Sequence, residues 1–302
     1  MADARTSRIS RELFLAAFGA GPGQVEPWVI DRLTAVVDED DARRGDTLYR
    51  VGDAPDGIYF LRQGRVKFVP EKGPGRFMDG PSVLGMFDAV LDRPRTRRVE
   101  ALTDLQLLRV PAEAWMDLLE DSFQLARLSL TSLARTVAQL EERAWAESPP
   151  GPTEPTAPAP TNAPRLDRLE RLVVLVDTPL LRGAGVQTLS DLASVSEEAS
   201  FDAGDDLFVA GARRDRVHIM VAGEVEAHRE SPRVEWRGGP GEIVCDVASL
   251  GETEVAWGAR AVTRVRTLAF RFEDWLDLME EHFEMVRSTL GALALQCEKL
   301  TG

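Results

Sequence analysis

The sequence contains little of the chemistry that holds metals or disulfides. Its 302 residues include two cysteines, Cys245 and Cys297, and three histidines. Two cysteines are too few for a disulfide framework, and no cysteine or histidine lies at the spacing of a metal site. We therefore expect neither a metal nor another cofactor.

Long apolar runs are also missing. No run approaches the roughly 20 residues that cross a bilayer, so no membrane partner is expected. The stretch "LFLAAFGAG" follows Arg5, Arg8 and Arg11 like a weak signal peptide, but Glu12 opens it and it is short. A similar stretch, "RLVVLVDTPLL", opens the second half of the chain. We interpret both as helices and expect a cytoplasmic protein.

Positive charge and catalytic motifs are scarce as well. Lysine and arginine number 36 against 50 acids, which gives a net charge of −14. Such a field repels nucleic acid, so no DNA partner is expected. The sequence has no G-x-S-x-G, phosphate-loop or H-E-x-x-H motif, and we predict that the protein is not an enzyme.

Proline, in contrast, is concentrated in one place. Residues 148–164 read "SPPGPTEPTAPAPTNAP", which is typical of an extended, semi-rigid linker. This linker divides the chain into predicted domains at 9–147 and 165–301.

The two halves match each other. "RRGDTLYRVGDAPDGIYFLRQGRVKF" (43–68) aligns with "DAGDDLFVAGARRDRVHIMVAGEVEA" (202–227), and Trp115 aligns with Trp275. Each half has two helical stretches, then short β segments with glycine turns, and finally a long helix. The repeat predicts two α+β domains of one fold, each a small β-barrel or roll with helical ends.

These segments carry a family resemblance. "GDTLYRVGDAPDGIYFLRQGRVKF" and "GMFDAVLDRPRTRRVEALTDLQLL" resemble the cyclic-nucleotide-binding domain of catabolite-activator-type transcription factors and of kinase regulatory subunits. The resemblance implies two tandem β-roll (jelly-roll) domains with flanking helices, each closed by a long C-terminal helix. It also implies a bacterial-type protein.

The resemblance implies a phosphate-binding cassette in the first half. Family cassettes pair Gly-Glu at a helix start with an arginine nine residues after the glutamate; helix N–H groups and the guanidinium bind the phosphate. Gly85 and Arg95 match, and Thr96 follows. Met86 replaces the glutamate that binds the ribose, since a thioether is a weak acceptor. Gly85, Arg95 and Thr96 are therefore candidate ligands for a nucleotide or other anion.

A vestigial pocket is the favoured alternative. In that interpretation Arg95 forms a salt bridge and its neighbours are solvated, as arginines on turns usually are. The cluster of Arg93, Arg95, Arg97 and Arg98 would then face an acidic protein partner.

The second half departs further from the cassette pattern. Cys245 occupies the glycine position, Asp246 the glutamate position and Val255 the arginine position. Glu252 and Glu254 add negative charge where a phosphate would bind. We expect no cyclic nucleotide in this half.

The closing helices carry apolar residues at alternating steps of three and four. This pattern fits either a coiled-coil seam or a helix that lies on its own domain. The predicted seam consists of Phe123, Leu130, Leu133, Val137, Leu140, Phe283, Val286, Leu290, Leu293 and Leu300.

The resemblance favours pairing of these helices, because the equivalent helix joins two protomers in catabolite-activator proteins. A linker of 17 residues reaches on the order of 50 Å. We predict an intramolecular pseudo-dimer; a homodimer built on the same seams is the alternative. Family transcription factors continue into a helix-turn-helix domain, for which we expect no room here.

Together these features predict a non-enzymatic regulatory or scaffold protein that binds another protein. The alternative is a sensor that binds a nucleotide or other anion in the first domain through Arg95.

Overall fold

The computed structural model describes residues 2–19, 22–70, 75–147, 164–181, 184–212, 216–228, 236–244 and 258–301. The cassette region of the second half, including Cys245, Asp246 and Val255, lies outside these residues. The chain forms two compact units, of which the first ends at Ser132 and the second spans Leu133–Thr301. None of the described helices has the length and hydropathy of a bilayer-spanning segment.

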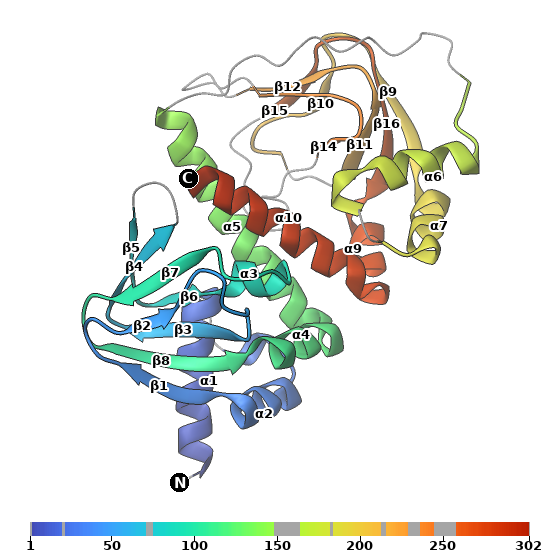
Figure 1. Ribbon diagram of the computed structural model, residues 1–302. Helices are drawn as coiled ribbons and strands as arrows, with labels where there is room; N and C mark the ends of the chain where they lie inside the picture. Colours follow the sequence, from blue (N-terminus) through green and yellow to red (C-terminus); the bar gives the residue numbers. More distant parts are fainter. Residues whose placement is uncertain are drawn as a thin grey trace. The chain divides into compact units, whose positions relative to one another are not determined.

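The first unit begins with two helices, continues as strands and ends in two more helices (Figure 1). Its elements are α1 (Ala2–Phe18), η1 (Pro22–Gln24), α2 (Pro27–Val36), β1 (Asp38–Ala42), β2 (Thr47–Tyr49), β3 (Gly57–Gln63), β4 (Arg65–Pro70), β5 (Arg76–Asp79), β6 (Ser82–Leu84), α3 (Met86–Val90), β7 (Arg97–Ala101), β8 (Leu105–Pro111), α4 (Ala112–Asp121) and α5 (Phe123–Glu147), which continues into the second unit.

The described strands of this unit form two antiparallel sheets in the orders β1-β8-β3-β6 and β2-β7-β4-β5. Side chains from both sheets share one apolar core, which includes Tyr49, Leu61, Leu84, Val99 and Leu107. The arrangement is a β-roll, as the sequence predicts.

The second unit repeats this order. Its elements after α5 are α6 (Arg168–Asp177), η2 (Pro179–Leu181), α7 (Val186–Val195), β9 (Glu197–Phe201), β10 (Asp206–Phe208), β11 (Arg216–Ala222), β12 (Val225–His228), β13 (Trp236–Gly238), β14 (Ile243–Val244), β15 (Gly258–Ala261), β16 (Val265–Arg271), α9 (Phe272–Glu281) and α10 (Phe283–Thr301). Its sheet orders are β14-β11-β16-β9 and β10-β15-β12-β13. Both orders correspond strand by strand to those of the first unit, so the predicted tandem fold is confirmed.

Matched glycines explain why both halves turn at the same places. Gly64 and Gly223 lie where the chain passes from one sheet of each domain to the other, and they have φ of 116° and 92°. A Cβ would lie 2.7 Å from the Asp104 carbonyl oxygen at the first position and 2.3 Å from the Arg264 carbonyl oxygen at the second. Only glycine fits such a left-handed and crowded turn.

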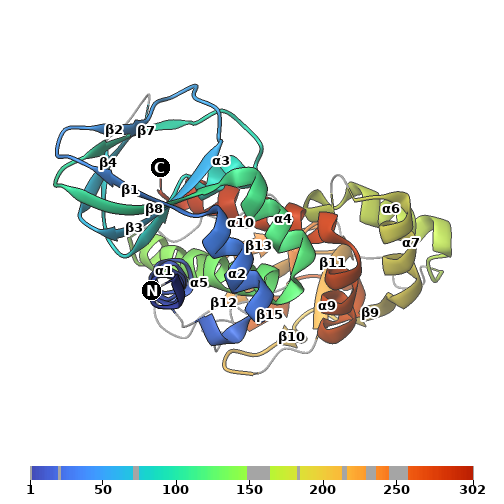
Figure 2. The same ribbon diagram turned by 90° about the horizontal axis from the view of Figure 1, so that it is seen from below.

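The helices that open the two units pack differently. Ile9, Leu13 and Phe14 of α1 are buried, and α1 packs against β3 and β6; Figure 2 shows α1 nearly end-on beside β3. The corresponding α6 packs instead on α7 and η2, and Leu175 is its buried residue.

The closing helices bury the middle of the predicted seam. Leu130, Leu133 and Val137 of α5 and Leu290 and Leu293 of α10 are buried. Val286 is buried too, while Phe123, Leu140, Phe283 and Leu300 are half-buried. Within the second unit, the Gln296 amide donates a hydrogen bond to the carboxylate of Glu141, which lies on the later part of α5.

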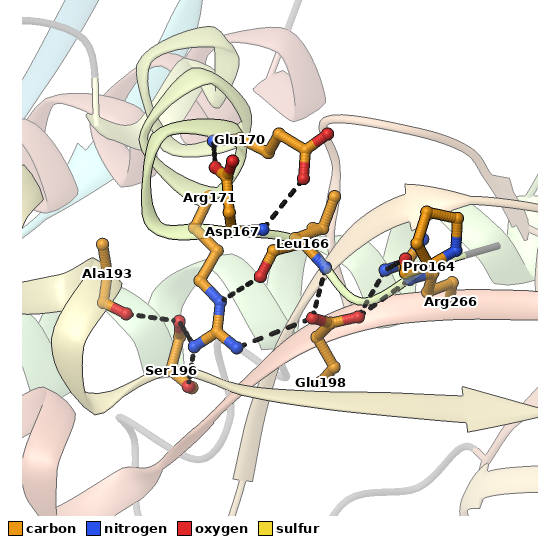
Figure 3. A network of polar contacts seen from close by, with 9 residues as sticks. All are labelled: Pro164, Leu166, Asp167, Glu170, Arg171, Ala193, Ser196, Glu198 and Arg266. Carbon is orange, nitrogen blue, oxygen red and sulfur yellow. Dashed lines mark hydrogen bonds and ion pairs between the residues drawn. The ribbon is translucent and has the colours of Figure 1, made fainter.

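A polar network fixes the end of the linker to the second β-roll (Figure 3). Glu198 of β9 accepts hydrogen bonds from the Leu166 N–H at 2.7 Å and from Arg266, and Arg266 also donates to the Pro164 carbonyl. Arg171 donates to the Ser196 carbonyl at 2.7 Å. The chain therefore enters α6 along a defined path.

Candidate functional site

The candidate site begins where β6 passes into α3. Gly85 has a φ of 79° and a ψ of 3°, and it precedes Met86, the first residue of α3. This left-handed conformation favours glycine. It turns the Gly85 carbonyl toward Arg95: the Arg95 Nη1 donates to that carbonyl at 2.6 Å.

Arg95 is buried, with 2% of its surface exposed. Its second terminal nitrogen, Nη2, donates to the carbonyl of Gly57 on β3. The guanidinium carbon lies 4.5 Å from the centre of the Tyr49 ring, a cation–π distance. The backbone is held too, because the Arg95 N–H donates to the Asp53 carbonyl and its carbonyl accepts from Gly52, both at 2.9 Å.

Burial affects two polar groups of this site, the Nε of Arg95 and the phenol of Tyr49. The Nε of Arg95 is buried and donates to no group of the described residues. Burial raises the pKa of Tyr49, with the Arg95 charge opposing that rise, so the phenol stays neutral beneath the guanidinium. None of the described carboxylates forms an ion pair with Arg95, so the expected salt bridge is not found.

Asp88 is a member of the site that the sequence analysis missed. It is 6% exposed, and its Oδ1 accepts from the Thr96 hydroxyl at 3.2 Å and from the Arg93 Nε at 3.1 Å. The Arg93 N–H also donates to the Asp88 carbonyl at 3.1 Å. One signal was available: Asp88 is the single charged residue in the otherwise apolar stretch "MFDAV".

The predicted arginine cluster separates into different environments. Arg95 points into the domain and is not part of any surface patch. Arg93 pairs with Asp88, and Arg98 pairs with Glu100 at 2.8 Å. The side chain of Arg98 is 42% exposed, and Arg97 is half-buried. The structure thus joins Gly85 and Arg95 directly and links Thr96 to them through α3.

This arrangement has the parts of an anion cradle in a closed form. A guanidinium with fixed backbone binds oxyanions through charge-assisted hydrogen bonds. Here both terminal nitrogens already donate to carbonyls, and Met86, the residue after Gly85, is half-buried. An anion would have to replace these carbonyl contacts and approach Asp88, whose carboxylate repels it.

Comparison with known proteins gives a consistent family match. A model described as the cyclic nucleotide-binding domain matches residues 39–122 and 198–282, more than half of the chain. No curated protein sequence matches.

Three solved structures are similar to this chain. The regulatory domain of Toxoplasma gondii PKA with cAMP is 13% identical over 96% of each chain, with a TM-score of 0.37. The regulatory subunit of a cAMP-independent protein kinase A from Trypanosoma cruzi, bound to guanosine, is 13% identical over 94% of this chain and 86% of that chain, with a TM-score of 0.36. The N-terminal domain of a transcriptional regulator from Streptomyces coelicolor A3(2) is 27% identical over 42% of this chain and 93% of that chain, with a TM-score of 0.37.

Proposed function

Because this chain belongs to the cyclic nucleotide-binding domain family, we propose that it is a cytoplasmic, bacterial-type regulatory or scaffold module that acts by binding another protein. In this proposal its domains no longer depend on cyclic nucleotide, and it has no enzymatic activity of its own.

The state of Arg95 carries the proposal. Its guanidinium is buried against the carbonyls of Gly85 and Gly57 and the ring of Tyr49. These contacts use the arginine as an internal support of the β-roll, and Met86 supplies no strong acceptor for a ribose hydroxyl. A domain that is complete without ligand can serve as a constant binding surface.

A first surface for such a partner lies around the cassette. Arg93, Arg97 and Arg98 bring positive charge to one segment of an acidic chain, which suits an acidic partner. The pairing of Arg93 with Asp88 and of Arg98 with Glu100 lowers the affinity that these two arginines could add.

We further propose that the closing helices pair within one chain as a pseudo-dimer. The support comes from the second unit, where the later part of α5 lies with α10 and Gln296 donates to Glu141. The buried seam residues Val137 and Leu293 fit such a pair.

The test of protein binding is a pull-down with the full chain from a lysate of its source organism, followed by mass spectrometry. We expect stoichiometric recovery of a protein whose binding weakens as salt rises. Recovery of no protein above a matched-charge control chain would overturn the proposal.

A ligand sensor is the second candidate function, and one observation favours it. The buried Nε of Arg95 lacks an acceptor, and leaving a donor unpaired costs about 1–3 kcal/mol. An oxyanion at Gly85 and Thr96 would supply that acceptor.

Thermal unfolding with cyclic AMP, cyclic GMP and cyclic dinucleotides separates the two candidates. A ligand at 100 times its dissociation constant stabilises by about 2.7 kcal/mol. We expect no shift. A saturable shift that Arg95→Lys and Thr96→Val remove, and that the control Arg98→Ala keeps, would establish the sensor instead.

A further inference from the structure

Helix α6 exposes a continuous row of aliphatic side chains. Leu169, Val173 and Val176 are 68%, 55% and 55% exposed. They are spaced i, i+4 and i+7, so they share one face of the helix. Single exposed apolar residues are ordinary, but a contiguous row of this kind marks an interaction site.

The fold explains why this face is uncovered. α6 buries its opposite side, through Leu175, against α7 and η2. Its counterpart α1 lies along a sheet and covers its own apolar residues, Ile9 and Phe14 among them. Both views show α6 beside α7, at the end of the second β-roll (Figure 1, Figure 2). None of the described residues covers the row, which we name the α6 stripe.

One flank of the α6 stripe is acidic. Glu170 and Asp177 are exposed and seven residues apart, so they lie on the same flank of the stripe. The Glu170 carboxylate accepts a hydrogen bond from the Asp167 N–H at 2.8 Å in a capping box. Arg168 does not offset this flank, because its guanidinium donates to Ser190 of α7 at 2.6 Å.

A second copy of the chain suits this surface poorly. In an antiparallel two-fold pair the same patch meets itself, which sets Glu170 against Asp177 of the other copy. The net charge of −14 adds repulsion between copies.

We propose that the α6 stripe docks a basic amphipathic helix of a partner protein. The partner's apolar row packs on Leu169, Val173 and Val176, and its lysines or arginines face Glu170 and Asp177. In this mode of helix-on-helix recognition, the acidic residues at the rim select a partner helix of positive charge and fix its orientation. The inference rests on the proposed function, since it names a docking surface and the chemistry of the partner.

Fluorescence anisotropy with the full chain tests the docking site. The probe is a helical peptide of leucine and lysine of about 18 residues, long enough to form a helix, and its twin carries glutamate for lysine. We expect the lysine peptide to bind and the glutamate peptide not to bind. Val173→Asp should weaken binding at least about tenfold, because it removes a buried aliphatic contact.

Matched variants keep the test specific. Val209→Asp introduces the same charge at a valine that is 50% exposed outside α6, and it should leave the affinity unchanged. Asp177→Lys should weaken binding of the lysine peptide and allow the glutamate peptide to bind. Circular dichroism verifies that each variant is folded. Equal binding by wild type and Val173→Asp overturns the proposal.

Two further readouts separate this inference from the proposed function. If the pull-down recovers the same partner with Val173→Asp, the docking site is wrong while protein binding stands. If no partner is recovered but binding of the lysine peptide still depends on Val173, the proposed function fails and the α6 stripe stands as a docking site. If light scattering gives a dimer that Val173→Asp dissociates, the stripe joins two copies and the partner helix is excluded.

Discussion

Gly85 and Arg95 depend on each other at the scale of single residues. The left-handed glycine turns its carbonyl to the guanidinium, and the guanidinium fills the space where a side chain would start. A Cβ at Gly85 would lie 2.6 Å from Nη1 of Arg95. Each residue therefore restricts what the other position accepts.

Gly85→Ala should destabilise the first domain by about 2–4 kcal/mol, because backbone strain and the contact with Arg95 add. Gly45→Ala is the matched control: its φ is 95°, but a Cβ there meets nothing within 4 Å. Strain alone should cost that variant about 1–2 kcal/mol. Urea unfolding measures both, and equal losses would show that Arg95 yields to the new methyl group.

Arg95→Met tests whether the arginine supports the fold. Two opposing effects compete. The change removes the guanidinium donors of the Gly57 and Gly85 carbonyls, and Gly85 keeps a long hydrogen bond from the Ala89 N–H at 3.4 Å. It also removes a buried charge with an unpaired Nε. We expect the first to prevail and the domain to lose about 1–3 kcal/mol in urea unfolding. A gain in stability would mean that Arg95 is retained for a ligand at the expense of the fold.

Sequence spacing predicted part of this site. It identified Gly85 and Arg95 because they occupy a local pattern. It did not identify the inward turn of Arg95, because Gly57 and Tyr49 lie on distant strands and only the closed sheets bring them together. Asp88 was missed for a similar reason: its partners Arg93 and Thr96 follow a turn whose direction the sequence does not specify.

At the scale of elements, the network around Glu198 ties the linker end, β9 and β16 together. Burial acts to raise the pKa of Glu198, but the hydrogen bonds from Arg266 and the Leu166 N–H, with the charges of Arg266 and Arg171, together outweigh it and lower that pKa. A carboxylate whose pKa is lowered by folding stabilises the protein above its ordinary pKa of 4.5. That contribution disappears as the pH falls through the lower folded value.

Glu198→Gln should therefore destabilise the second β-roll by about 1–3 kcal/mol at neutral pH. The loss should shrink as the pH falls below 4.5 and through the lowered pKa of Glu198, because the wild-type carboxylate then becomes protonated as well. Amide hydrogen exchange in β9 and β16 measures this loss of stability directly. Glu197→Gln is the control, because its pair with Arg216 is 62% exposed on the glutamate side and solvent screens it. A loss independent of pH would assign the effect to packing.

The element order was predictable because local signals repeat. Glycine turns and alternating apolar residues indicated strands in both halves, and the sheet orders follow the alignment. The exposed stripe of α6 was not predictable, since an apolar periodicity does not reveal which neighbour covers it.

At the scale of the whole molecule, one chain should satisfy both closing-helix seams. Light scattering should then give a mass near 33.3 kDa across a wide concentration range. Leu293→Ala should keep that mass while lowering stability by about 2–4 kcal/mol, because it opens a cavity in a buried seam. A wild-type mass near twice this value would show that the seams pair between chains.

The matched glycine turns have a consequence for how such a protein changes over generations. Gly64 and Gly223 satisfy a demand of the backbone that both halves share, whereas Arg95 has Val255 as its counterpart, so the two halves keep one fold with different residues at this position. After a gene duplicates, mutations at positions of the second kind leave both copies folded even where they lower stability. One copy can thus lose an inherited task and be selected for a new one without passing through an unfolded ancestor.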